Sequence, residues 1–173
     1  MTSDRSDAPK PVTAARSRRA KRPPTASEQL EELDAAEAVD EALRELEDLI
    51  ELQGQEVNWL RTAPLPLVWP RAVLQQLLVA ALEAALEAAR GERRVSVRLE
   101  QAEREGVELV VEGGPGQPTR VRESFPCRAA ELLAEQRGGI FSLQTEGQVR
   151  LSLRLPRVGL VGAVPEGRME KIA

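Results

Sequence analysis

The chain has 173 residues, enough for one domain with some length to spare, and its 24 Lys and Arg against 28 Asp and Glu give a net charge of −4. It contains no histidine and a single cysteine, Cys127, which excludes a histidine-dependent catalytic triad, histidine metal ligands, a phosphorylated histidine and an internal disulfide on this chain. Aromatic residues make up 2% of the sequence, so few surfaces are available for stacking on bases or sugars.

The first 26 residues form a basic arm. Seven Lys or Arg stand there against two Asp, a net charge of +5, which leaves −9 for residues 27–173. The arm is rich in proline and poor in large apolar side chains, which predicts disorder because it cannot bury enough surface to offset its ordering entropy. Candidate contacts to nucleic acid, an anionic membrane or an acidic partner are Arg16, Arg18, Arg19, Lys21 and Arg22. The alternative is a solvated tail that aids solubility.

A helix is predicted after the arm. Thr25 and Glu28 have the spacing of a capping box, and Gly54 is a suitable residue to end the helix. Between them, apolar residues recur at helical spacing at Leu30, Leu33, Val39, Leu43, Leu46 and Ile50. We expect residues 27–38 to form a helical extension, in which the first two leucines either pack on the domain's own core or pair with a second copy or a partner's helix.

The rest of the sequence alternates between strands and helices. Helices are predicted over 70–90 and 127–136, with a proline-rich connector over 63–69, a glycine-rich loop over 113–118 and a loosely held tail over 157–173. Strands are predicted over 56–61, 94–100, 107–112, 140–145 and 148–155. This order favours a two-layer α/β sandwich, in which about three helices cover one face of a mixed, mostly antiparallel sheet.

The element order and four local strings resemble the ATP-binding domain of histidine kinases, the GHKL or Bergerat-type ATPase. The strings follow the family's order: VDEALRELEDLIELQGQEVNWL, WPRAVLQQLLVAALEAALEAA, VELVVEGGPGQP and AAELLAEQRGGIFSLQTEGQVRLSLRLP. Together they cover roughly residues 39–156, so the resemblance implies a histidine-kinase ATPase-like domain over that range.

The resemblance also implies where a nucleotide pocket would lie. Glu112 stands where the family has an aspartate that reads adenine, and Gly114 and Gly116 match its close-approach glycines, although an ordinary tight turn would need them equally. Ala80 aligns with the asparagine that completes magnesium coordination, and a methyl group cannot ligate a hard cation. Gln76, four residues earlier, keeps an amide on a longer side chain.

The segment that matches the family's lid and second glycine box departs further. Its aligned positions, 124–127, contain no glycine, and Pro126 removes one backbone amide donor from the place where the family holds phosphate. Arg120, Arg122 and Arg128 would attract phosphate from nearby, or else lie in a solvated loop.

These departures predict a non-catalytic pseudo-ATPase, without cofactor or metal, that acts as a protein-binding adaptor or regulator in bacterial signal transduction. The expected partner is a kinase, a response regulator or a sigma factor, with a homodimer through the first helix as a further option. Two alternatives stay open. One is an ATP-binding regulator, such as an anti-sigma-type kinase, that uses the pocket residues above; the other is a nucleic-acid-associated protein that uses the basic arm. No stretch resembles a signal peptide or a membrane span, which favours the cytoplasm.

Overall fold

The structure, a computed structural model, describes residues 29–103, 106–115 and 123–160. The basic arm, the predicted capping box at Thr25 and Glu28, Gly116 and residues 161–173 lie outside these ranges. The elements in chain order are β1 (Glu31–Asp34), α1 (Ala35–Glu45), α2 (Glu47–Gln53), β2 (Glu56–Leu60), β3 (Pro66–Trp69), α3 (Arg71–Ala88), β4 (Arg94–Gln101), β5 (Val107–Pro115), α4 (Phe125–Gln136), β6 (Ile140–Gln144) and β7 (Gln148–Leu155).

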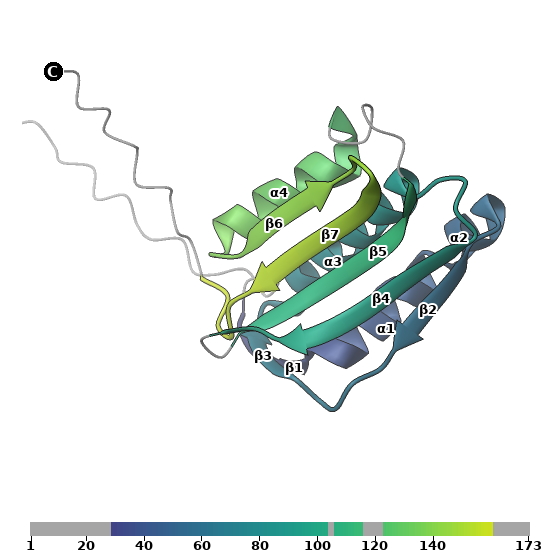
Figure 1. Cartoon of the computed structure of the whole chain (residues 1–173). Helices are drawn as coiled ribbons and strands as arrows, with labels where there is room; N and C mark the ends of the chain where they lie inside the picture. The colour runs from purple at the N-terminus through teal and green to yellow at the C-terminus, as the bar shows by residue number, and fades with distance from the viewer. Residues whose placement is uncertain (1–28, 104–105, 116–122, 161–173) are drawn as a thin grey trace, which may run out of the picture.

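A five-stranded sheet forms one layer of the molecule, and the helices lie together on one of its faces (Figure 1). The strand order is β2-β4-β5-β7-β6, with β2 parallel to β4 and every other neighbouring pair antiparallel. The predicted two-layer α/β sandwich with a mixed, mostly antiparallel sheet is therefore confirmed. Within the ranges described above, no helix is long and apolar enough to cross a membrane.

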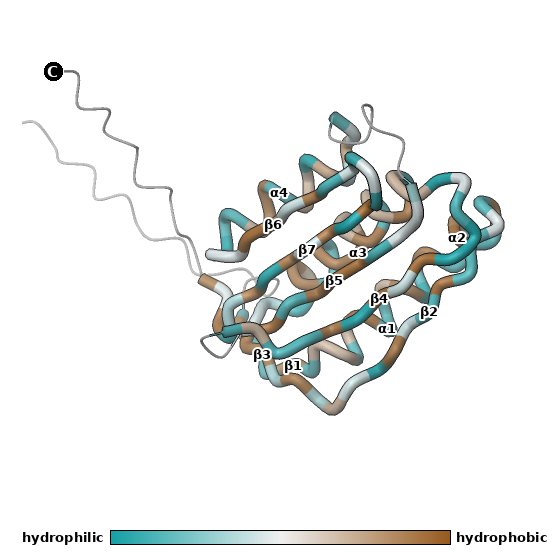
Figure 2. Tube along the Cα trace, viewed as in Figure 1, coloured by the Kyte–Doolittle hydropathy of each residue, from teal (hydrophilic) through white to brown (hydrophobic). Residues whose placement is uncertain are grey.

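The core lies between the sheet and α3. Strands β4, β5 and β7 place every second side chain in this layer, and Figure 2 shows the resulting alternation of apolar and hydrophilic residues along them. Half of the 18 residues of α3 are buried, including Leu78 and Leu82. Each such leucine contributes about 1.5–3 kcal/mol by leaving water, so this contact holds the two layers together.

The predicted helical extension over 27–38 is wrong for residues 31–34, which form a strand. Residues Glu31–Asp34 form β1, which pairs antiparallel with β3, and Leu33 is buried there opposite Leu67. The helix begins only at Ala35. Its N-cap is Asp34, whose carboxylate oxygen accepts a hydrogen bond from the backbone N–H of Ala36, with 3.0 Å between the oxygen and the nitrogen. Leu30 and Leu33 thus do not share a helical stripe, and the proposed dimer seam through them is lost.

The predicted first helix is also divided at Leu46. The backbone there leaves the helical region, yet the N–H of Ile50 still bonds to the carbonyl of Leu46, so α2 follows α1 after a break of one residue. The predicted end of the helix at Gly54 is confirmed: its φ of 64° is left-handed, a conformation that glycine adopts without a Cβ penalty.

Residues 157–160, the described part of the predicted tail, are held against the domain rather than loosely attached. The segment Pro66–Trp69, expected to be only a connector, is strand β3, and it bonds to both β1 and the tail. The buried Trp69 donates its indole N–H to the carbonyl of Pro156 at 2.9 Å, and Gly159 lies against its ring. The N–H of Gly159 donates to the carbonyl of Val68 at 2.9 Å.

Candidate functional site

Two of the residues predicted to line a nucleotide pocket, Glu112 and Gly114, line one hollow together with Asn58 and Glu92, whereas Gln76 does not belong to it. Gln76 is exposed on α3, in the helical layer. Ala80, one turn further along the same helix, is partly buried and packs its methyl group against the core. Among the described residues, no three Cys, Asp or Glu side chains gather in a way that could hold a metal ion.

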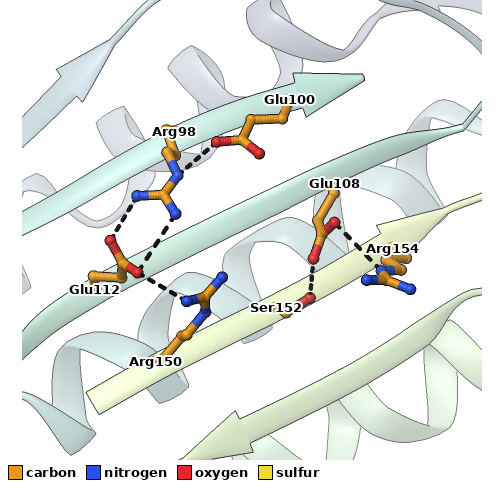
Figure 3. Close-up of polar contacts among 7 residues, drawn as sticks. All are labelled: Arg98, Glu100, Glu108, Glu112, Arg150, Ser152 and Arg154. Carbon is orange, nitrogen blue, oxygen red and sulfur yellow. Dashed lines mark hydrogen bonds and ion pairs between the residues drawn. The ribbon is translucent and has the colours of Figure 1, made fainter. Parts of the chain in front are cut away.

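Glu112 lies on the other face of the sheet, away from the helices. Along β5 the side chains of Leu109 and Val111 enter the core, so strand alternation directs Glu112 to the opposite side. There its carboxylate binds two arginines from neighbouring strands (Figure 3): Arg98 of β4, at 2.6 Å and 3.4 Å through its two terminal nitrogens, and Arg150 of β7, at 3.4 Å. Glu112 is therefore separated from Gln76 by the thickness of the sheet.

A network of alternating charges continues along this outer face. Arg98 also binds Glu100 at 2.7 Å, and the hydrogen bond to Glu112 is the main cause that raises the pKa of Arg98. Further along, Glu108 accepts from the Ser152 hydroxyl and pairs with Arg154 at 3.3 Å (Figure 3). The hydrogen bond from Ser152, assisted by Arg154, lowers the pKa of Glu108 and keeps this carboxylate charged at neutral pH.

The glycine run after Glu112 forms the end of β5, where a loop was expected. Gly113 and Gly114 belong to the strand, and the register with β7 shifts between Glu112 and Pro115. A Cβ on Gly113 would lie 2.7 Å from the Cβ of Ala89 at the end of α3. On Gly114 it would overlap the side chain of Glu92. Neither has a positive φ, so packing, rather than a special backbone conformation, explains at least Gly113.

Two of the backbone positions in the first turn of α4 have no free N–H to offer a ligand. Ser124 is the N-cap, and its hydroxyl accepts from the backbone N–H of Cys127 at 3.4 Å. Pro126 in the first turn has no N–H to donate. Of the arginines expected near a phosphate, Arg128 is exposed on α4, whereas Arg120 and Arg122 lie outside the described residues.

One titratable group on α3 has a perturbed environment. Glu83 is partly buried, and burial, followed by repulsion from Glu87 one turn away, raises its pKa. The two carboxylates lie on the same stripe of α3 as Gln76 and Ala80, the stripe that is only partly covered by neighbouring elements. This stripe therefore offers two carboxylates and one amide, and none of these side chains makes a polar contact with another described residue.

Three solved structures identify the fold. No family model matches the sequence, and no curated protein matches it. The chain resembles the nucleotide-free catalytic domain of the histidine kinase ThkA (16% identity, TM-score 0.62, 76% of this chain and 99% of that one). It also resembles the mycobacterial sensor histidine kinase MprB, with 18% identity and a TM-score of 0.59, over 76% of this chain and 99% of MprB. Full-length ShkA in complex with AMPPNP matches over 80% of this chain and 33% of ShkA, with 16% identity and a TM-score of 0.63.

These matches confirm that the chain has the fold of histidine-kinase catalytic domains, the GHKL ATPase fold, over most of its length. At such low identity the likeness establishes the fold alone.

The roles of Arg98 and Arg150 as partners of Glu112 were not predicted from the sequence. In the strand register Arg150 lies directly opposite Glu112, and Arg98 lies diagonal to it, two residues beyond the opposite residue Ser96, so only a correct pairing of the strands would have revealed these contacts.

Proposed function

We propose that this chain is a non-catalytic member of the histidine-kinase ATPase fold, which serves as a protein-binding adaptor or regulator in signal transduction. The observation that carries the proposal is the position of Glu112. The carboxylate expected to read adenine lies on the outer face of the sheet, bound to Arg98 and Arg150, while Gln76 lies in the helical layer. Residues on opposite faces of a sheet cannot contact one small ligand together.

Three further features support the absence of phosphoryl transfer. Ala80 presents a methyl group where a magnesium ligand would be needed. The contact between Gly113 and Ala89 brings the end of β5 directly against α3. The first turn of α4 has one N–H bound by Ser124 and another replaced by Pro126, which weakens it as a phosphate cradle. Phosphoryl transfer depends on metal and donor positioning, and these residues supply neither.

Titration calorimetry with Mg²⁺-ATP tests the proposal. We expect no binding tighter than about 100 μM, which corresponds to roughly −5.5 kcal/mol. A matched pair of variants, Glu112→Ala and Gln76→Ala, should leave the heats unchanged. Binding tighter than this limit that is lost in both variants would overturn the proposal and favour the ATP-binding regulator, the alternative to which the AMPPNP complex of ShkA lends weight.

The adaptor role itself is tested by direct binding to purified candidates. A kinase, a response regulator and a sigma factor from the same organism would each be titrated against the full chain. We expect saturable binding to at least one of them in the absence of nucleotide, and failure with all three would count against the adaptor role.

A further inference from the structure

A shallow, mainly apolar hollow opens where α1, α2 and the edge strand β2 meet. Three apolar and three charged side chains line it: Leu43, Ile50, Trp59, Asp40, Arg44 and Glu47. Trp59 is only partly buried, and its indole N–H donates to the Asp40 carboxylate at 2.7 Å, which fixes the ring at the hollow. Among the described strands, β2 lies at the edge of the sheet, with β4 as its one neighbour (Figure 1).

The rim of the hollow is strongly acidic on the α2 side. Glu47, Asp48 and Glu51 are exposed, α2 contains no basic residue, and none of the three forms an ion pair with another described residue. On α1, by contrast, the Asp40 carboxylate forms an ion pair with Arg61 at 3.3 Å, which offsets part of the negative charge of Asp40. The surface therefore combines partly buried apolar side chains with three α2 carboxylates that form no ion pair with another described residue, and one cation, Arg44, lies beside them in the lining.

We propose that the occupant of this hollow is the chain's own basic arm, residues 1–26. The arm carries +5, opposite in sign to the rim. The described chain begins at residue 29, two residues before β1, and β1 leads directly into α1. The 18 residues of α1 and α2 span about 27 Å at 1.5 Å per residue. An extended arm reaches roughly 85 Å, so the hollow is within its range.

The side chains of the arm suit this surface chemically. An arginine guanidinium stacks on an indole and its methylene groups cover apolar neighbours, which fits Trp59 beside Leu43 and Ile50. Its charge then meets the free carboxylates of α2. Each contact is weak alone, but the tether gives the arm an effective concentration of about millimolar, so weak contacts suffice. A docked arm is withheld from nucleic acid or a partner until salt or a competing polyanion releases it. This inference concerns the arm and does not depend on the absence of ATPase activity.

Acrylamide quenching of Trp59 fluorescence in the full chain tests the proposal, since the other tryptophan, Trp69, is fully buried. Two variants are compared with the wild type at about 20 mM and about 0.5 M salt. The first neutralises the arm with Gln at Arg16, Arg18, Arg19, Lys21 and Arg22; the second is Glu47→Gln, Asp48→Asn and Glu51→Gln. At low salt we expect the quenching constant of each variant to be about twofold above that of the wild type, and all three to converge at high salt.

A matched control carries the same change of charge elsewhere: Glu131→Gln, Glu135→Gln and Glu146→Gln, all exposed and away from the hollow. This control should behave as the wild type. The proposal is overturned if neutralising the arm leaves quenching unchanged at low salt, or if the control raises it as much as the α2 variant. Circular dichroism verifies folding, and if the α2 variant does not fold, the arm variant decides the question alone. Release of the arm by a DNA oligonucleotide, seen as increased quenching of the wild type, would support it further.

Discussion

A substitution at Gly113 tests whether the glycines at the end of β5 are needed for packing rather than for ligand binding. A Cβ built on it lies 2.7 Å from the Cβ of Ala89 and 3.8 Å from that of Val149. Carbon atoms normally approach to about 3.5–4.0 Å. The substitution Gly113→Ala therefore forces β5 and α3 apart by roughly 1 Å at this point. Overpacking of this kind costs about 1–3 kcal/mol, so we expect the free energy of unfolding to fall by about 2 kcal/mol.

A double-mutant cycle makes this prediction specific. Ala89→Gly removes the methyl group that the new side chain would meet, at its own cost of about 0.5–1 kcal/mol. In the double variant we expect about 1–2 kcal/mol of the loss to be recovered, measured by urea unfolding with unchanged m values. Gly114→Ala is the control: the three atoms nearest to its Cβ all belong to the flexible side chain of Glu92, which can move aside, so its cost should stay below about 0.5 kcal/mol. The reasoning is refuted if Gly113→Ala is as stable as the wild type, or if the two changes simply add.

Three further predictions concern charge and catalysis. Ser152→Ala should cost about 1 kcal/mol at pH 7. Because the hydrogen bond lowers the pKa of Glu108, this stabilisation is fully present above the usual carboxyl range and is lost progressively as the pH falls from that range through the lowered pKa. The cost measured by urea unfolding should therefore shrink as the pH is lowered below about 4, and a cost that does not change would contradict this. Glu83→Gln should stabilise the fold at pH 7 by about 0.5 kcal/mol, since burial and Glu87 raise the pKa of Glu83 and disfavour its charged form; the gain should vanish near pH 3.5, where a glutamate in either state is protonated. An equal gain at both pH values would contradict this. Ala80→Asn should not produce Mg²⁺-ATP hydrolysis in a phosphate-release assay, and measurable turnover would show that the remaining site is competent.

The sequence predicted the sheet well because its strands follow simple rules. Residues 94–100 and 148–155 alternate apolar and polar side chains with period two, and each forms a strand within a residue or two of the expected ends. Glycines likewise predicted where elements end, and both Gly54 and Gly147 have a positive φ at such a turn. Such local patterns determine the elements, and the order of elements was enough to suggest the fold.

The start of the domain was misassigned because its structure depends on distant contacts. Leu30 and Leu33 fit a helical spacing, but pairing with β3, more than 30 residues away, makes residues 31–34 a strand. A local signal existed: Asp34 followed three residues later by Glu37 is itself a helix N-terminus pattern, and Asp34 is the observed cap. The predicted capping box at Thr25 and Glu28 lies outside the described residues.

The outward direction of Glu112 could not be found by motif alignment, because an alignment does not show which face of a strand a residue occupies. Matching letters put it at a ligand-reading position, but Leu109 and Val111 already fix which side of β5 enters the core. By the same alternation, Glu112 points outward and Gly113 inward. A strand-parity test applied to the sequence alone would have separated the carboxylate from the helical layer. It could not have supplied Arg98 and Arg150, which depend on register between strands.

The two charged surfaces of the molecule differ in what they leave for a partner. On the outer face of the sheet, Glu108 and Glu112 are each bound by arginines of neighbouring strands, so much of their charge is neutralised within the sheet. The carboxylates of α2 form no ion pair with another described residue, and Arg44 of α1 is the cation that lies beside Glu47 in the lining of the hollow. A partner guided by electrostatics gains more at the second surface, since its cations need not displace existing ion pairs. We therefore infer that an adaptor with this fold would bind a basic partner at α1 and α2, in competition with its own arm, and that neutralising the arm would raise affinity for that partner at low salt.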